Sequence, residues 1–226
     1  MTTADLLNEI KTDINEVYEA GYKSFWDDYT NKNNITVDCR YMFYGPYWTN
    51  EIFTPPYPIK PNKNNSRYMF QESGITKVST KQIDFSEATT LRQTFVQSYV
   101  EEVEMVVDKA TLNATFDGVD TLEKLDLTVS ENTGYSNAFN ECSGLVDLTI
   151  RGTIGKAGFN LTDCVNLSVE SVRSVLNACN KENANITITL PYYCIDGETD
   201  TSDICFTELA ADYNAAIANG YLISWN

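Results

Sequence analysis

The residue types that most often carry enzyme chemistry are either missing from this sequence or scattered along it. The 226-residue chain contains no histidine, which excludes a Ser/His/Asp or Cys/His nucleophilic site and a histidine-ligated metal. Its six cysteines include no C-x-x-C pair, the spacing that a zinc site needs. Glycine-rich phosphate loops of the Walker and Rossmann types are absent as well. The sequence therefore predicts a protein that is not an enzyme and that uses no cofactor or metal.

One acidic segment, residues 191–206, places oxygen ligands at alternate positions, as calcium loops do. Its acidic side chains are Asp196, Glu198, Asp200 and Asp203. The segment lacks the glycine and the bidentate glutamate that complete an EF-hand loop, so we expect a solvated loop and keep calcium as the alternative. Cys194 and Cys205 flank the acids, and the sequence is compatible with either two free thiols or a disulfide.

The charge balance limits the partners of the chain. The formal net charge is -16, with 32 acidic and 16 basic residues. Such a chain repels phosphate backbones and anionic lipid surfaces. No stretch approaches the roughly 18 apolar residues of a membrane span, and the N-terminal segment has neither the basic nor the apolar region of a secretory signal. We therefore expect no nucleic-acid partner, no membrane partner and no export by the usual route.

Residues 1–30 have the apolar spacing of a helix with a heptad seam. The seam residues are Leu7, Ile10, Ile14 and Val17. Two heptads are too short for a stable isolated coiled coil, so this helix either packs on its own chain or joins further copies in a homo-oligomer such as a trimer. We favour oligomerisation or docking as its role.

Residues 31–67 hold five of the six prolines together with many aromatic residues. Proline at this density prevents a regular helix or a central strand, which predicts a loop-rich collar whose rings cover the start of the next region. Exposed rings also stack on the apolar faces of sugars, so a buried collar and a sugar-binding collar both remain open. The candidates for glycan or partner contact are Tyr44, Tyr47, Trp48 and Tyr57.

Between residues 68 and 167 an apolar pattern recurs every 21 to 25 residues. Each unit begins with Phe or Leu, continues with a small or apolar residue three positions later, and ends in an L-x-x-L-x-L type segment. This pattern is the signature of leucine-rich repeats, whose short strands bury their apolar edges by stacking on neighbouring repeats. The predicted repeat core consists of Phe70, Phe95, Phe116, Leu122, Leu125, Phe139, Cys142, Leu145, Leu148, Leu161, Cys164 and Leu167.

Residues 168–226 predict a terminal cap of helix, strand, helix and strand. Ser168 is suited to cap the first helix, and residues 185–191 alternate apolar and polar side chains up to a proline. Thr207 is expected to cap the second helix, which ends near Gly220. The predicted fold is therefore α/β: an irregular leucine-rich-repeat solenoid with short parallel strands, preceded by a helix and closed by this cap.

One unit, Phe139-Asn-Glu-Cys142-Ser-Gly-Leu145-Val-Asp-Leu148-Thr-Ile150, resembles the repeats of BspA-like leucine-rich-repeat proteins. Further segments are similar to repeat proteins encoded by phages and prophages of Gram-positive gut bacteria; they are Val17–Gly21, Phe25–Asp27, Phe43–Gly45, Tyr68–Phe70, Ser73–Thr76 and Ile154–Leu161. This sequence departs from the pattern where Ser or Val replaces Cys in the repeats, and in the acidic insertion.

The resemblance implies a non-enzymatic protein of the phage virion, at the tail or baseplate. Its implied partners are further copies of itself, other virion proteins, and a host surface receptor or glycan. The alternative is a bacterial adhesin or a protein or glycan interaction module of the BspA type. Such an adhesin would need an export signal or a wall anchor.

Overall fold

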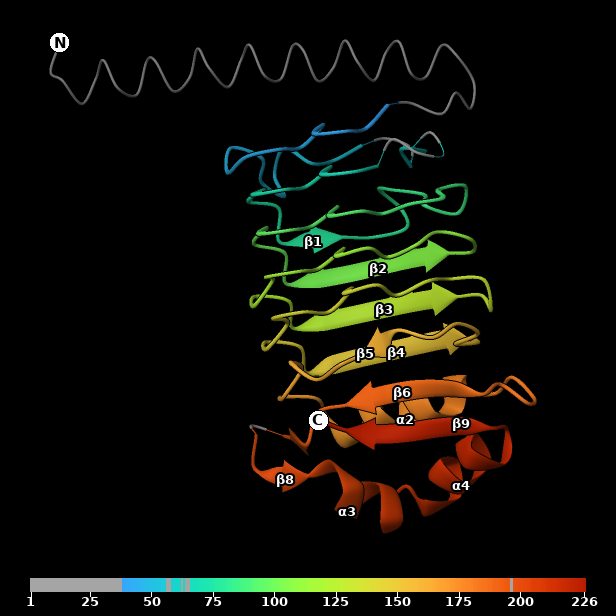
Figure 1. The fold of residues 1–226 in the computed structure, drawn as a ribbon. Coiled ribbons are helices and arrows are strands. Elements are labelled where there is room, and N and C mark those ends of the chain that lie inside the picture. Colours follow the sequence, from blue (N-terminus) through green and yellow to red (C-terminus); the bar gives the residue numbers. More distant parts are fainter. Residues whose placement is uncertain (1–37, 56–57, 62, 64–65, 196) are drawn as a thin grey trace, which may run out of the picture.

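The computed structural model describes residues 38–55, 58–61, 63, 66–195 and 197–226. The described chain is mixed α/β, with parallel sheets and a few helices near its C-terminal end (Figure 1). The predicted heptad helix, with Leu7, Ile10, Ile14 and Val17, lies outside the described residues. Within the described residues, no helix combines the length and the apolar character that crossing a bilayer would require.

Four short strands pair in parallel in chain order: β1 (Lys77–Val78), β2 (Glu102–Val107), β3 (Lys124–Val129) and β4 (Asp147–Gly152). The register places Lys77 beside Glu102, Glu102 beside Lys124, and Lys124 beside Asp147. Strands that are 22 to 25 residues apart in the sequence therefore lie side by side, and the chain advances by one strand with each unit (Figure 1).

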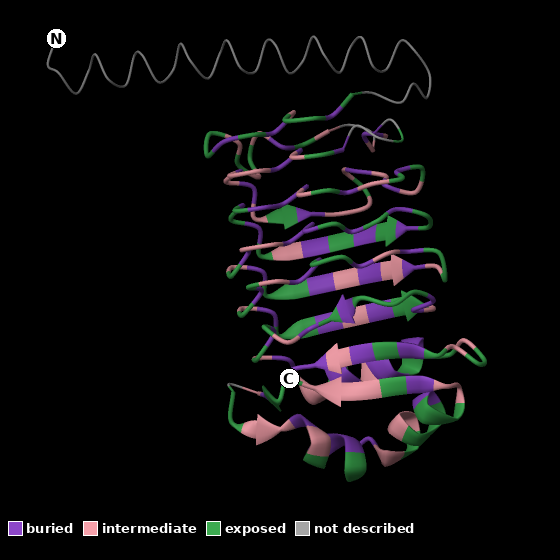
Figure 2. Ribbon diagram, in the orientation of Figure 1, coloured by how far each residue is buried: buried purple, intermediate pink, exposed green. Residues whose placement is uncertain are grey.

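Along these strands, buried and solvent-facing side chains alternate, as the two-residue period of a strand requires (Figure 2). In β2, Val103, Met105 and Val107 point inward, while Glu104 and Val106 are exposed. All twelve residues of the predicted repeat core are buried. The inner side of the sheet is therefore apolar, and the outer side carries the polar residues.

A column of phenylalanine rings runs through this core. Phe70 and Phe95 stack with ring centroids 5.0 Å apart and planes 3° apart, and Phe95 and Phe116 follow at 5.2 Å and 7°. Phe139 continues the column at 6.1 Å and 8°. Phe43 precedes it, 5.2 Å from Phe70 and tilted by 21°. The column therefore extends into the segment that the sequence predicts as a separate collar.

The backbone on both sides of each of these five rings is left-handed. The residues two before and two after each ring have positive φ, between 50° and 93°, in the pairs Tyr41 and Gly45, Tyr68 and Glu72, Gln93 and Gln97, Ala114 and Gly118, and Asn137 and Glu141. Residues other than glycine lose about 1–2 kcal/mol in this conformation. Backbone hydrogen bonds between neighbouring units offset the loss: the N–H of Phe95, for example, donates to the Thr115 carbonyl at 2.9 Å.

The edge of β1 is closed by a side chain. The Asn50 Oδ1 atom accepts hydrogen bonds from the N–H groups of Thr76 and Lys77, both at 3.2 Å. Its Nδ2 atom donates to the Thr76 hydroxyl at 2.7 Å. Asn50 therefore occupies hydrogen-bonding positions that another strand would use.

The helix α2 (Val169–Ala178) closes the opposite edge, against β4. Its predicted cap is confirmed, because the Ser168 hydroxyl accepts a hydrogen bond from the Ser171 N–H. A second parallel sheet follows, in the order β5 (Phe159–Asn160), β6 (Ile186–Leu190) and β9 (Tyr221–Trp225). β6 and β9 fall where the sequence predicts the two strands of the cap.

The acidic insertion is not the solvated loop that the sequence predicts. An antiparallel hairpin, β7 (Tyr193–Cys194) and β8 (Thr199–Asp200), leads directly into α3 (Thr201–Phe206). Asp200 caps α3 by accepting a hydrogen bond from the Ser202 N–H at 2.8 Å.

The prediction that Thr207 begins a helix is also wrong. Thr207 ends α3, and its N–H donates to the carbonyl groups of Asp203 and Ile204. The next helix, α4 (Ala210–Ala218), begins after Leu209 without a side-chain cap. Asp200 provides the earlier helix start because its carboxylate satisfies a free N–H of the first turn. α4 ends before Gly220, as predicted.

Candidate functional site

The outer side of the β1–β4 sheet carries its side chains in rows that cross the strands, because in-register parallel strands set matching positions side by side. The first row is Lys77, Glu102, Lys124 and Asp147, in which the sign of the charge alternates. The Lys77 ammonium pairs with the Glu102 carboxylate, with Nζ 2.7 Å from Oε1. This row is therefore neutral as a whole.

The second row places two acids next to each other. Glu104 lies beside Asp126, which is followed by Thr149. Like charges directly opposite each other on neighbouring strands repel. Asp126 is partly compensated by an ion pair with Arg151, which belongs to the third row. Glu104 is exposed and stands at the acidic centre of this face.

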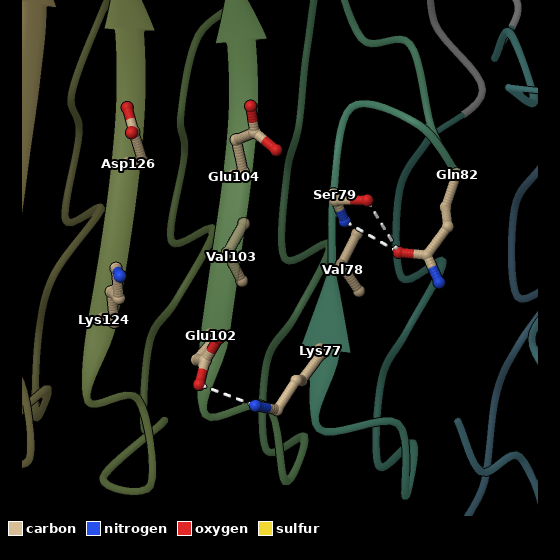
Figure 3. A pocket seen from close by; sticks show the side chains of 9 residues that line it. All are labelled: Lys77, Val78, Ser79, Gln82, Glu102, Val103, Glu104, Lys124 and Asp126. Carbon is tan, nitrogen blue, oxygen red and sulfur yellow. Dashed lines mark hydrogen bonds and ion pairs between the residues drawn. The ribbon is translucent and has the colours of Figure 1, made fainter. Parts of the chain in front are cut away.

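A groove of about 440 Å³ runs across the first two rows (Figure 3). The residues that line it are Lys77, Val78, Ser79, Gln82, Glu102, Val103, Glu104, Lys124 and Asp126. They come from β1, β2, β3 and the turn after β1. The groove is shallow and charged, which suits contact with another surface better than enclosure of a small molecule.

The end of the groove beyond β1 is held in place by Gln82. Its Oε1 atom accepts hydrogen bonds from the Ser79 N–H at 2.9 Å and from the Ser79 hydroxyl at 3.1 Å (Figure 3). Its Nε2 atom donates to the Phe53 carbonyl at 3.1 Å. These bonds tie the turn after β1 to the preceding segment, so this wall of the groove is fixed before any partner binds.

Ion pairing keeps the first row charged. The hydrogen bond from Lys77 lowers the pKa of Glu102, and the same contact raises the pKa of Lys77. Both shifts favour the ionised forms, so the pair carries fixed charges at neutral pH. Such a pair is suited to electrostatic recognition, whereas a general acid or base needs a pKa near the working pH.

The thiols lie in the interior of the protein. All six cysteines are buried, and Cys194 and Cys205 do not form a disulfide, so the described structure has the free-thiol state of that pair. Desolvation raises the pKa of Cys142, Cys179 and Cys205 to about 12 in each case. Because the thiolate is the nucleophilic form, these side chains are held in their inert state.

The predicted calcium residues have other roles in the structure. The Asp200 carboxylate accepts hydrogen bonds from the N–H and the hydroxyl of Ser202, at 2.8 and 2.6 Å. Asp203 lies in the first turn of α3, Glu198 lies in the hairpin turn, and Asp196 falls outside the described residues. Among the residues that the structure describes, no three Cys, Asp or Glu side chains converge in a group that could hold a metal ion.

The predicted aromatic contacts that the structure describes have different environments. Tyr44 and Tyr47 are exposed. Trp48 instead packs edge-on against Phe43, with the centroids 4.9 Å apart, and is partly buried against the core. Tyr57 falls outside the described residues.

The sequence interpretation missed two tyrosines that do belong with Tyr44. The Tyr41 ring stacks on Tyr68 at 5.0 Å and lies edge-on to Tyr44 at 6.1 Å. Both missed residues stand two positions before a ring of the phenylalanine column. That shared offset is the signal that could have identified them.

Comparisons of the chain with models of protein families, with curated proteins and with solved structures give no match.

Proposed function

We propose that this chain is a leucine-rich-repeat solenoid that acts as a non-enzymatic docking protein of a phage virion. Its outer β1–β4 face would contact another virion protein. The observation that carries the proposal is the row-wise arrangement of fixed charges on an open, rigid sheet. The recurrence of one strand, one Phe and one left-handed pair per unit supports the repeat assignment.

The state of the reactive groups supports binding rather than catalysis. The thiols are buried with raised pKa values. Of the groove carboxylates, Glu102 and Asp126 are paired with cations and Glu104 is exposed to solvent. Catalytic groups usually lie in an enclosed site that moves their pKa toward neutrality. The features of this face are instead those of a recognition surface.

The acidic centre of the face, Glu104 and Asp126, disfavours a second copy of the same chain at that point of an interface. If two copies met about a two-fold axis parallel to the strands, the order within each row would be reversed. Glu104 would then meet Asp126 of the other copy, twice. A two-fold axis perpendicular to the strands would place Glu104 against the same residue of the other copy. Like-charge contacts of this kind suppress an interface.

The occupant that fits is a different protein, with a lysine or arginine opposite Glu104 and Asp126. Flanking charges that alternate in sign, to match Lys77, Glu102 and Lys124, would complete the contact. Self-association is assigned to another part of the chain, the heptad seam of residues 1–30. In this arrangement, residues 1–30 would form the homo-oligomer and the outer β1–β4 face would remain free for the partner.

The virion assignment has its support in the sequence resemblance to phage-encoded repeat proteins. Particles of the phage that encodes the chain would be purified and analysed by mass spectrometry and by labelling with a specific antibody. We expect the protein at one end of the particle, at the tail or baseplate. Its absence from the particles, together with its recovery from the cell wall, would favour the bacterial adhesin instead.

The docking face can be tested in the same particles. Glu104→Lys combined with Asp126→Lys reverses the acidic centre and should lower incorporation into particles at least tenfold. Glu182→Lys combined with Glu208→Lys changes the net charge equally at exposed positions outside the face and should leave incorporation unchanged. Circular dichroism would establish that both variants are folded. Equal incorporation of the two folded variants would contradict the assignment of this face.

A further inference from the structure

We propose that the tyrosines near the start of the described chain form a binding platform for a neutral oligosaccharide. The platform consists of Tyr41, Tyr44, Tyr47 and Tyr68, with Glu72 at its side. It lies outside the docking face of the sheet, so a test of glycan binding does not depend on the proposed docking function.

Three rings of the platform, Tyr41, Tyr44 and Tyr68, contact one another, and the exposed Tyr47 follows Tyr44 by three residues in the chain. Tyr41 and Tyr68 stack with planes 5° apart and centroids 5.0 Å apart. Tyr44 lies edge-on to Tyr41 at 6.1 Å and 80°. The Tyr44 hydroxyl donates a hydrogen bond to the Glu72 Oε2 atom at 3.2 Å, and the neighbouring carboxylate raises the pKa of Tyr44. The cluster is therefore organised before a ligand arrives.

Much of this aromatic surface remains in water. The exposed fractions of Tyr41, Tyr44 and Tyr47 are 53%, 47% and 74%. At roughly 200 Å² per ring, these three residues offer about 350 Å². A stable protein interface needs roughly 800 Å² per partner, which is more than twice this area. The aromatic area alone is smaller than a stable protein interface and is large enough to cover a few sugar rings.

The two stacked tyrosines stand at a left-handed backbone position that recurs in every unit of the phenylalanine column. Tyr41 and Tyr68 have φ values of 57° and 58°, in the left-handed region that bulky side chains avoid. At the equivalent positions, later units have Gln93, Ala114 and Asn137. Each tyrosine costs about 1–2 kcal/mol in backbone energy. Among the five units of the column, tyrosine stands at this position only in the first two, and these are the two rings that stack.

The polar groups around the rings select the chemistry of the ligand. Tyrosine rings stack on the apolar C–H faces of sugars, and their hydroxyl groups bond to sugar hydroxyls. The Glu72 carboxylate can accept hydrogen bonds from further sugar hydroxyls. It would repel an acidic sugar, as would the net charge of -16. A neutral hexose or N-acetylhexosamine oligosaccharide fits both conditions.

The test uses the full chain and an array of neutral hexose and N-acetylhexosamine oligosaccharides, with sialylated and phosphorylated glycans on the same array. We expect binding to at least one neutral oligosaccharide and none to the acidic glycans. Titration with the best neutral probe should show at least tenfold weaker binding for Tyr44→Ala and for Tyr47→Ala. Tyr193→Ala removes a ring of similar exposure, 46%, from the other end of the chain and should bind normally. A blank array, or equal binding by all three variants, would overturn the proposal.

A second measurement separates a binding role from a structural one. Asparagine tolerates the left-handed conformation, so Tyr41→Asn and Tyr68→Asn should keep or raise the midpoint of urea unfolding while they weaken glycan binding. If both variants lower the midpoint and bind the probe as the parent does, the tyrosines serve the fold alone and the proposal is wrong.

Discussion

Ser171 in α2 provides the hydrogen-bond acceptor for the backbone of Leu148 in β4, with its hydroxyl oxygen 2.7 Å from the Leu148 nitrogen. The same hydroxyl donates to the Val146 carbonyl at 2.7 Å. One turn further along the helix, the Ser174 hydroxyl accepts from the Ile150 N–H, also at 2.7 Å. A helix can therefore end this sheet because two serines replace the backbone of a missing strand.

The variant Ser171→Ala should destabilise the protein, because it leaves the Leu148 N–H without its acceptor at a site that water does not reach. The Val146 carbonyl loses one of its two bonds and keeps the one from the Ser168 N–H. A buried polar group without a partner costs about 1–3 kcal/mol. Urea unfolding followed by circular dichroism measures the change. Ser143→Ala, at an exposed position, should shift the free energy of unfolding by less than about 0.5 kcal/mol. Equal effects of the two substitutions would mean that the Ser171 hydroxyl does not support the strand edge.

Gln97→Gly should make the protein more stable. Gln97 is exposed and has a φ of 55°. Glycine at this position removes about 1–2 kcal/mol of backbone strain from the folded chain. Its greater conformational freedom in the unfolded chain lowers the free energy of unfolding by about 0.5–1 kcal/mol. The expected net gain is about 0.5–1 kcal/mol in the urea unfolding experiment. Glu104→Gly, in the regular strand β2, should destabilise by about 0.5–1 kcal/mol. A loss of stability in both variants would contradict the left-handed assignment at Gln97.

Alkaline pH should unfold the protein through its thiols. The pKa values of Cys142, Cys179 and Cys205 are about 12 in the folded chain, against a usual value of 9.0. Between these values the unfolded chain loses thiol protons that the folded chain keeps. The protonated thiols therefore make their full contribution to the free energy of unfolding below pH 9. This contribution is lost as the pH rises toward 12, by about 1.4 kcal/mol per pH unit for each thiol.

The measurement is the free energy of unfolding at several pH values between 7 and about 11. Cys142→Ala should be less stable than the parent at neutral pH because it leaves a cavity, and it should lose stability less steeply as the pH rises. Curves that stay parallel for parent and variant would show that this thiol does not contribute to the alkaline transition.

The sequence predicts the periodic part of the molecule because apolar spacing directly encodes which side chains are buried. The twelve core positions from Phe70 to Leu167 are buried, and the Ser168 cap forms as expected. The repeat spacing also predicts parallel strands, which β1 to β4 confirm.

Features that are decided by contacts between distant segments could not be predicted from the spacing of residues in the sequence. Thr207 and Asp200 are both plausible helix caps in the sequence, and only the hairpin that ends at Asp200 decides between them. Trp48 and Tyr47 are equally aromatic, yet Trp48 turns inward because Phe43 provides a packing partner. The left-handed pairs are hidden as well, because Gln97 and Glu72 have no intrinsic preference for that conformation.

The Asn50 side chain has a consequence for the behaviour of the protein at high concentration. An open strand edge is a template on which a further chain can assemble into a continuous fibre. Asn50 occupies the N–H groups of Thr76 and Lys77 at one edge of the sheet, and the α2 serines occupy those of Leu148 and Ile150 at the other. Both edges of the β1–β4 sheet are therefore closed, so this sheet is protected against amyloid-like growth by the same amide and hydroxyl groups that complete its own hydrogen bonding.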